Sequence, residues 1–552
     1  MDNVLICLTL LSLFIISGII SRLVLSVPAP FIQIAVGAVA SFFIPLLQVS
    51  FNPEVFMVLF IPPLLFSDSW HFPKREFLSN TKPIIMLSIG LVFFTVVGLG
   101  YLIHWLLPIL PQAACFALAA AVSPTDAVAL KSMTAKLGLP LRMWHILQGE
   151  ALLNDASGLV SFKFAVAALF SGLFSIQDAF LSLILISAGG ILIGVLLSYG
   201  FVWILGRLSL HRFEETTIEN LLLILLPYSA YLAAEFFHSS GILAAVAAGF
   251  TIDKVGFLDR TMVNMRIEGR FVWGMLELTL NGIIFVLLGI YLPNTMHLID
   301  EIGISFSLGF TIVGIITFSL IFLRFIWVSL MLPLDKLFTS KKTKVWQLPD
   351  FTLLLAMSFG GIRGAIALAA ILSLPNFISS GIAFPARDLL IIIVVGVVLC
   401  SLILSTIVLK IVLPRLKITT SSNPLDEENT ARIAAAQAGI KAVERKMSAI
   451  IKDLNESEAA VCQQVGNALM ASLNLFIVSA VGEEAEKNTS LQALTYEEKL
   501  RLSALDAARH ELRKLKRQGK INNTTMINMM HRLDLRQFSL MDENKIYPRK
   551  HD

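Results

Sequence analysis

Residues 112–131 read QAACFALAAAVSPTDAVALK, an apolar segment that is long enough to cross a membrane but carries a polar break near its centre. Pro124 has no backbone N–H, so a helix running through it would leave carbonyl groups one turn earlier without a donor. We therefore predict two half-helices on either side of Ser123, Pro124 and Thr125. Within a bilayer such a break is tolerated only where protein buries it or where it lines a water-filled cavity.

A second apolar segment, residues 351–374, is interrupted by the sequence GGIRG at 360–364. Gly361 and Gly364 carry no side chains, so another backbone can cross them closely. Interrupted helices at corresponding positions of two repeats indicate a binding site for a transported solute. The two breaks are therefore the first candidates for a functional site.

The composition of the whole chain is that of a membrane protein. Of its 552 residues, 56% are hydrophobic and 15% are charged, and the mean hydropathy is +0.78. A soluble chain carries about 25% charged residues. The apolar residues form runs of roughly 18 to 28, enough to cross a hydrocarbon core of about 30 Å as helices. We predict an all-α polytopic membrane protein.

We count about thirteen membrane-spanning helices, which divide into six, a linker and six. The two sixes would enter the membrane from opposite sides, as in an inverted-topology repeat, and the fifth helix of each is a broken one. The predicted spans are residues 3–22, 30–48, 54–68, 84–107, 112–131, 146–172, 180–207, 218–237, 240–252, 272–293, 303–333, 351–374 and 386–413.

Cations are concentrated in alternate loops between these spans, and by the positive-inside rule those loops face the cytoplasm. We therefore expect a multi-pass protein of the cell (inner) membrane, with its N-terminus outside and its C-terminal tail in the cytoplasm. The net charge of +4 does not reveal this uneven distribution, and no nucleic-acid partner is predicted. The cation-rich loops hold Arg22, Lys74, Arg75, Lys82, Lys131, Lys136, Arg142, Arg207, Arg212, Lys254, Arg260, Arg266, Arg270, Lys336, Lys341, Lys342 and Lys344.

Residues 1–414 form the predicted membrane domain, and residues 415–552 form a soluble tail rich in Ala, Glu, Lys, Asn and Arg. The tail is expected to be structural, oligomerising or regulatory, and no ligand is predicted for it. The four cysteines have no metal-site spacing, and no cofactor is predicted. Helical periodicity in the tail predicts helices near 424–454, 456–481, 494–518 and 522–537.

Four ionisable side chains are expected near the centre of the bilayer: Asp126, Glu150, Asp155 and Arg363. Each costs about 3 kcal/mol near the centre of a bilayer. A buried ion pair can offset the arginine and one carboxylate, and we predict Glu150 as the partner of Arg363, with Asp126 as the alternative. This pairing leaves Asp155 as the carboxylate with exchangeable charge.

Asp155 is suited to bind a proton and a cation in turn. Burial makes a carboxylate hold its proton more tightly than it does in water, so the two ions can compete for it. Asn154 can orient the carboxylate without adding charge. The backbone of Thr125, together with the carbonyls freed by the break, can coordinate a dehydrated cation. Asp126 is suited either to capping the second half-helix or to binding the ion directly.

Other polar groups near the membrane give weaker signals. Ser67 and Asp68 lie near the cytoplasmic end of the third span, where they are candidates for an ion entrance. A further set is expected toward span ends, where long side chains reach the interface or pack between helices. This set comprises Glu235, Glu277, Asn281 and Arg324.

Several short motifs occur in a recognisable order: FIPPLLF at 60–66, SPTD at 123–126, GEALLND at 149–155, SGIL at 240–243, FVLLG at 285–289 and GIRG at 361–364. Together they resemble the sodium/proton exchanger family, the NhaP/NHE branch of the monovalent cation:proton antiporters. The resemblance covers the whole membrane part and looks closest to the bacterial YjcE-type members.

The resemblance implies a homodimer in membrane lipid, with a dimerisation domain and a mobile core domain that moves as an elevator. It also implies a site where the two broken helices cross, with Na+ (or K+ or Li+) and protons as the transported ions. Carried onto this chain, it makes Asp155 the ion-binding carboxylate, flanked by Thr125 and Asp126, supported by Asn154, with Glu150 paired to Arg363.

The chain departs from the family pattern at two positions. Ser67 stands where archaeal relatives often carry Glu, and Ala151 stands where some relatives carry Ser. Asn154 before Asp155 is the pattern associated with electroneutral exchange of one cation for one proton. The alternatives are a K+/H+ or other small-ion carrier on the same fold, and a channel or sensor. No enzyme is predicted, because the sequence lacks the HExxH and GxSxG motifs of membrane hydrolases.

Overall fold

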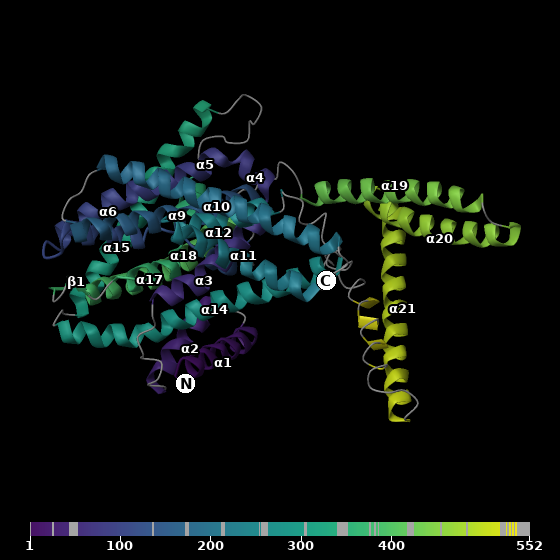
Figure 1. The fold of residues 1–552 in the computed structure, drawn as a ribbon, viewed down its shortest axis with the longest axis horizontal. Coiled ribbons are helices and arrows are strands. Elements are labelled where there is room, and N and C mark those ends of the chain that lie inside the picture. Colours follow the sequence, from purple (N-terminus) through teal and green to yellow (C-terminus); the bar gives the residue numbers. More distant parts are fainter. Residues whose placement is uncertain are drawn as a thin grey trace. The chain divides into compact units, whose positions relative to one another are not determined.

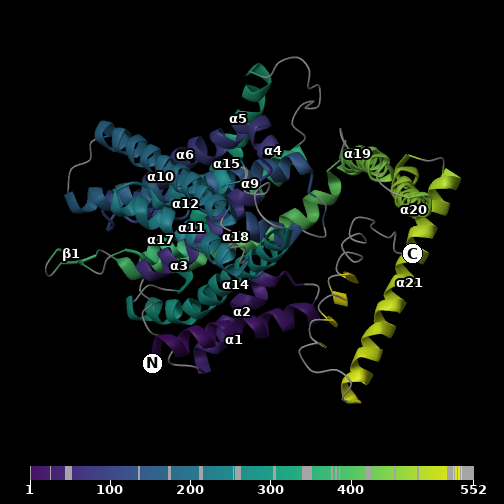
Figure 2. The same ribbon diagram turned by 45° about the vertical axis from the view of Figure 1, so that its right-hand side comes forward.

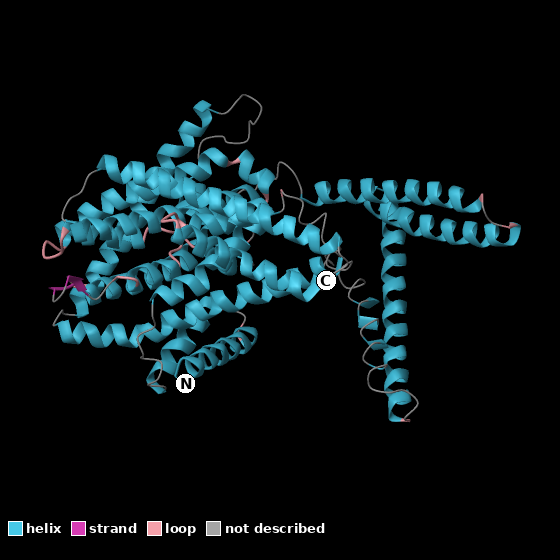
Figure 3. Cartoon of the chain, viewed as in Figure 1, coloured by secondary structure: helices cyan, strands magenta, loops and turns pink. Residues whose placement is uncertain are grey.

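The computed structural model describes residues 2–537 with gaps at 25–26, 44–52, 135–136, 138, 172–175, 211–215, 253, 255–262, 303–305, 339–350, 375–376, 380–381, 385, 417–423, 453–454, 482–483, 519–525, 527–528, 531–532 and 535. Nearly all described residues are helical (Figure 3). The chain divides into two compact units, Met1–Ile418 and Thr419–Asp552.

The first unit begins with helices α1 (Asp2–Leu23), α2 (Ala29–Phe43), α3 (Pro53–His71), α4 (Lys74–Ser79), α5 (Thr81–Ile85), α6 (Val92–Leu106), α7 (Gln112–Ala121), α8 (Ala127–Thr134) and α9 (Leu141–Ser171). A π-helical turn, η2 (Met86–Leu91), joins α5 to α6.

It continues with α10 (Ile176–Leu210), α11 (Thr216–Phe236), α12 (Gly241–Ile252), α14 (Val263–Ile302), α15 (Phe306–Phe338), α16 (Phe351–Phe359), α17 (Ala365–Leu372), α18 (Arg387–Val412) and a 3-10 turn, η3 (Leu413–Arg415). A short antiparallel hairpin of β1 (Phe377–Ser379) and β2 (Ile382–Ala383) lies between α17 and α18 (Figure 3).

Within the described residues, each predicted span overlaps one or more helices of this unit. Within the described residues, eight helices are long and apolar enough to cross a membrane. The apolar helices α2, α7 and α12 are shorter. The chain is therefore a helical multi-pass membrane protein.

Small residues allow the helices to pack closely. A Cβ on Gly37 of α2 would lie 2.1 Å from the carbonyl oxygen of Val286 of α14, and a Cβ on Gly289 would lie 2.1 Å from that of Ile34. Glycine at both positions lets the two backbones touch, as small residues do in membrane helix pairs. Figures 1 and 2 both show α1, α2 and α14 side by side.

The helices of the first unit pack as two groups. One group contains α1–α3, α10–α12 and α14, and the other contains α5–α9 and α15–α18. The groups meet where α14 contacts α15, α17 and α18, where α3 contacts α9 and α17, where α12 contacts α9, and where α2 contacts α8. The boundary between them passes beside both broken helices.

In its described part, the second unit contains α19 (Pro424–Ile451), α20 (Glu456–Val481) and α21 (Glu484–Arg517). Helix α20 packs against α19 and α21. Helix α21 begins at Glu484, ten residues before the predicted start at residue 494, because a polar, charge-rich turn still favours a helix. Most of the predicted helix 522–537 lies outside the described residues.

Candidate functional site

The two helix breaks are in direct contact. Helix α7 ends at Ala121 and α8 begins at Ala127, while α16 ends at Phe359 and α17 begins at Ala365. The backbone N–H of Asp126 donates a hydrogen bond of 2.7 Å to the carbonyl of Ile362. The unwound stretches thus cross and satisfy part of each other's backbone, which a bilayer requires.

Gly364 makes this crossing close. A Cβ at Gly364 would lie 2.5 Å from the Cβ of Asp126, a separation that real Cβ atoms do not show. The position therefore accepts glycine alone without a shift of the backbone. A neighbouring helix, α18, contributes the hydroxyl of Ser401, which accepts a hydrogen bond of 3.3 Å from the backbone N–H of Arg363.

The side chain of Asp126 caps the half-helix α8. Its Oδ1 accepts hydrogen bonds from the backbone N–H groups of Val128, at 2.8 Å, and Ala129, at 3.0 Å. This places a carboxylate at the positive end of the helix dipole. The sequence left open whether Asp126 caps the half-helix or binds the ion directly, and these hydrogen bonds show the capping role. Asp126 also borders the cavity described below.

The predicted ion pair between Glu150 and Arg363 is wrong, because Glu150 binds Arg324 instead. The Arg324 guanidinium donates to both carboxylate oxygens of Glu150: Nη1 to Oε1, and Nη2 to Oε2 at 2.6 Å. Both side chains are 1% exposed, so each charge depends on the other. The guanidinium Nε also donates to the carbonyl of Met357 at 2.9 Å.

Arg324 was assigned to a span end, whereas it lies deep in α15 and fully buried. Gly361 makes room for it, because a Cβ there would lie 2.6 Å from the Arg324 Cζ. The sequence feature that could have predicted this burial is that Arg324 is the one cation in the predicted span 303–333. A single cation in so long an apolar run indicates a buried partner.

Arg363 instead neutralises the end of α7. It is 4% exposed, and its Nη1 donates to the carbonyl of Ser123 and, at 3.3 Å, to the carbonyl of Pro124. These are carbonyls at the broken end of the half-helix, where the helix dipole is negative. The arginine therefore needs no carboxylate partner, which is the physical reason the predicted pairing fails.

A hydrogen-bond network joins α9 to the first break. Asn154 Nδ2 donates to Thr125 Oγ1 at 2.7 Å, and Thr125 Oγ1 lies 3.5 Å from Glu150 Oε1, to which it donates. The Oδ1 atom of Asn154 is buried and has no hydrogen-bond partner among the described residues. Asn154 thus positions Thr125 and keeps an acceptor free.

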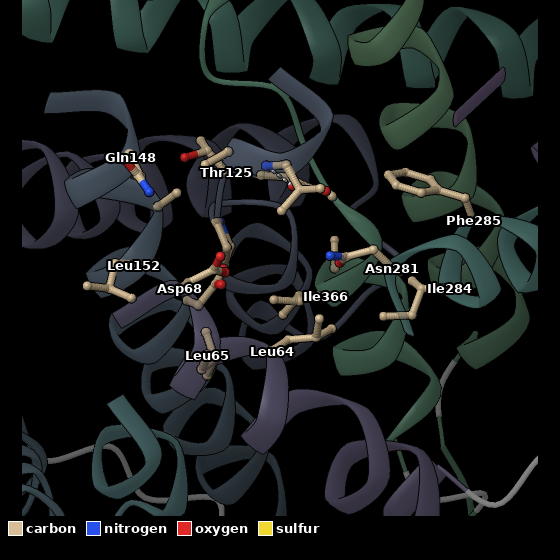
Figure 4. Close-up of a pocket in the computed structure, with 18 residues that line it drawn as sticks. Leu64, Leu65, Asp68, Thr125, Gln148, Leu152, Asn281, Ile284, Phe285 and Ile366 are labelled. Carbon is tan, nitrogen blue, oxygen red and sulfur yellow. Dashed lines mark hydrogen bonds between the residues drawn. The ribbon is translucent and has the colours of Figure 1, made fainter. Parts of the chain in front are cut away.

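A cavity of about 60 Å³ lies beside this network, enough for a few water molecules or a partly hydrated ion. Asp155 borders it and is 6% exposed. In the part of the chain that the structure describes, no group donates a hydrogen bond to the Asp155 carboxylate. Asp126 also lines the cavity, as do Asp68, Thr125, Gln148 and Asn281, which Figure 4 labels.

The carboxylates around the cavity interact with one another. The charges of Asp126 and Asp68 both act on Asp155, and those of Glu277, Asp126 and the opposing cation Lys131 act on Asp68. Carboxylates in a shared low-dielectric site repel when all are ionised, and a bound cation or proton relieves the repulsion. The cavity is thus electrostatically prepared for a positive ion.

The two candidate entrance residues occupy different positions. Asp68 borders the cavity, whereas Ser67 is fully buried and donates a hydrogen bond of 2.9 Å to Oε2 of Glu277 on α14. Ser67 therefore ties two helices together rather than lining the cavity. Ala151 borders the cavity but offers no side-chain oxygen. The neutral amides of Gln148 and Asn281 were not predicted as cavity groups.

Comparisons with known proteins agree on one family. The family model described as "Sodium/hydrogen exchanger, transmembrane" matches residues 8–415. A protein of Escherichia coli K12 named "Uncharacterized Na(+)/H(+) exchanger YjcE" is 38% identical over 96% of this chain and 97% of its own. A protein of Bacillus subtilis named "Sodium, potassium, lithium and rubidium/H(+) antiporter" is 37% identical over 95% of this chain and 76% of its own.

The fold also has a solved counterpart. The structure of the sodium proton antiporter MjNhaP1 from Methanocaldococcus jannaschii at pH 8 aligns with a TM-score of 0.55. The alignment covers 75% of this chain and 100% of that one, at 20% sequence identity. At this identity the likeness concerns the fold alone.

Proposed function

The chain belongs to the sodium/hydrogen exchanger family and is a cation:proton antiporter, and from this premise we propose that a monovalent cation and a proton compete for Asp155. The proposal rests on the burial of this carboxylate and on its lack of hydrogen-bond donors in the described part of the chain. Asp155 is buried beside the crossed breaks and receives no hydrogen bond from the described protein, whereas Glu150 is matched by Arg324 and Asp126 by a helix end.

The proposed exchange needs one titratable group. A cation that enters the cavity displaces the proton of Asp155, and a proton that arrives from the other side of the membrane displaces the cation. One carboxylate then carries one positive charge in each direction, so the exchange is electroneutral, with one cation for one proton. An additional charge would couple transport to voltage by about 2.3 kcal/mol per 100 mV.

The surrounding residues hold the ion and its carboxylate. We assign Thr125 to the ion site through its backbone, because the break leaves carbonyls there without helical partners. Asn154 holds Thr125 by the hydrogen bond of 2.7 Å. Asp126 borders the cavity and fixes the start of α8, and Asp68 attracts cations at the entrance. In this proposal Glu150 and Arg324 stabilise the core without binding the ion.

We propose that the two helix groups provide alternating access. Asp68 and Asn281 belong to the group of α3 and α14, while Thr125 and Asp155 belong to the group of the broken helices. We propose that the second group moves as an elevator against the first, which forms the homodimer. Inverted six-helix repeats with thirteen spans, an external N-terminus and a cytoplasmic tail from residue 415 complete the proposed architecture.

Na+ is the proposed cation. The Bacillus subtilis relative is named for sodium, potassium, lithium and rubidium, so K+ and Li+ are the other candidates here. A carrier for K+ alone on the same fold is the second candidate function. Sequential ion jumps with Na+, K+ and Li+ on proteoliposomes that contain a pH-sensitive dye separate these candidates.

Asp155→Asn is the direct test, since Asn keeps the shape of the side chain and removes its titratable charge. We expect cation-driven proton movement in proteoliposomes to fall to the level of protein-free vesicles, while the variant elutes from gel filtration like the wild type. Exchange that survives would assign the ions to another carboxylate, first to Asp126. Conductance or signalling that survives would favour a channel or sensor.

The stoichiometry has its own measurement. Valinomycin and a K+ gradient set the membrane potential of the proteoliposomes. The rate of electroneutral exchange does not depend on this potential. A sodium-driven pH change that follows the clamped potential would exclude one-to-one exchange.

A further inference from the structure

Several of the oxygens predicted to surround the cation at Asp155 are already engaged in hydrogen bonds. The Asp126 carboxylate accepts two backbone N–H groups, and the Thr125 hydroxyl is engaged by Asn154 and Glu150. Ala151 contributes no side-chain oxygen. A dehydrated monovalent cation needs several oxygen ligands, so the cavity must supply others.

Asn281 supplies an uncommitted oxygen to the cavity from α14. Its side chain extends from α14 into the cavity, across from Asp68 (Figure 4). It forms no hydrogen bond with any group in the described part of the chain. An amide that borders a small acidic cavity without a protein partner is available to a ligand there.

The backbone around Asn281 is held rigidly. The next residue, Gly282, is packed so closely that a Cβ there would lie 2.3 Å from the ring of Phe14 and 3.0 Å from Gln33 Nε2. One turn earlier, Glu277 accepts the hydrogen bond of Ser67. Helix α14 is therefore fixed to α1 and α2 on one side and to α3 on another. Its cavity-facing position is set by this packing.

We infer that the amide oxygen of Asn281 completes the oxygen shell of the cation at Asp155 and sets which monovalent cation the transporter prefers. The inference rests on the proposed function of Asp155. An amide oxygen is a neutral ligand with a weaker field than a carboxylate, and selectivity depends on the number and field strength of the ligands. A weak-field ligand favours larger ions such as K+ and Rb+, whereas carboxylates alone favour Li+ and Na+.

The test measures the Michaelis constant for Li+, Na+, K+ and Rb+ chlorides with full-length protein in dye-loaded proteoliposomes. For Asn281→Ala we expect the ratio of the K+ constant to the Li+ constant to rise about tenfold over wild type, which corresponds to about 1.4 kcal/mol. Leu278→Ala is the matched control on the same helix, because Leu278 is 65% exposed. Its ratio is expected to stay within about twofold of wild type.

Asn281→Asp is the second variant, which keeps the size of the side chain and replaces the neutral oxygen by a stronger-field one. It is expected to shift the same ratio in the same direction. A ratio within twofold of wild type in both variants, with Asp155→Asn inactive, overturns the role of Asn281 and leaves the proposed function standing. Wild-type protein without cation-driven proton exchange would instead overturn the proposed function.

Discussion

The ion pair between Glu150 and Arg324 yields the most discriminating prediction about the core. Both side chains are 1% exposed and share two hydrogen bonds. Removing one partner of such a pair leaves an unpaired buried charge and costs about 3–5 kcal/mol. Arg324→Met should therefore lower the free energy of unfolding by about that amount, and Glu150→Gln should do so to a lesser degree, because its amide oxygen still accepts from Arg324.

A double-mutant cycle isolates the pair. Unfolding by SDS in mixed micelles, followed by circular dichroism, gives the free energy of each variant. We expect Glu150→Gln and Arg324→Met to show a coupling energy of about 3 kcal/mol, because the double variant leaves no unpaired charge. The matched cycle of Glu150→Gln with Arg363→Met should give about 1 kcal/mol or less, since those two groups interact by charge alone.

The opposite order would refute the assignment. If Glu150 coupled more strongly to Arg363 than to Arg324, the bidentate pair would not be the main partner of this carboxylate. Heat-induced loss of the monodisperse gel-filtration peak provides a second measurement of the same ranking.

Three further predictions concern the breaks and the helix contacts. Asp126→Ala removes the cap of α8 and should cost about 1 kcal/mol of stability in the same unfolding assay, whereas Asp126→Asn retains an acceptor and should cost less. Gly364→Ala should abolish exchange or folding, because its Cβ would lie 2.5 Å from that of Asp126, whereas Gly274→Ala, with nothing within 4 Å, should behave as wild type. Gly37→Ala should separate α2 from α14 and lower the melting temperature by several degrees. Gly18→Ala on α1 is the control and should leave the melting temperature unchanged, because nothing lies within 4 Å of its Cβ. Equal melting temperatures for the two variants would contradict the backbone contact between α2 and α14.

The membrane fold could be predicted from the sequence because its causes are local. Apolar runs of spanning length, Pro124 in one of them and the glycines at 360–364 in another depend only on neighbouring residues and on the bilayer. In the described part of the chain, helices overlap the predicted spans, and the helices at 112–131 and 351–374 are interrupted at these positions. The isolation of Asp155 as a buried carboxylate came from the same argument, because an intramembrane charge is costly wherever the chain folds.

The partners of the buried charges required the tertiary structure. Arg324 and Arg363 both lie in apolar segments far from Glu150 along the chain. The spacing of residues in the sequence does not decide which of the two arginines pairs with Glu150. The choice depends on which helix packs against α9 and on Gly361, which leaves space for the Arg324 guanidinium. Arg363 is satisfied by carbonyls that exist only because another helix is broken beside it.

The sequence by itself thus predicted the apolar helices, the two positions at which helices break and the buried carboxylate of Asp155. Only the tertiary structure decided that Glu150 belongs to Arg324, that Asp126 caps α8 and that Asn281 faces the cavity. The physical reason is that helix formation and membrane insertion depend on local hydrophobicity and backbone chemistry. Pairing and cavity lining depend on the rotation and separation of helices, which close packing between distant segments fixes.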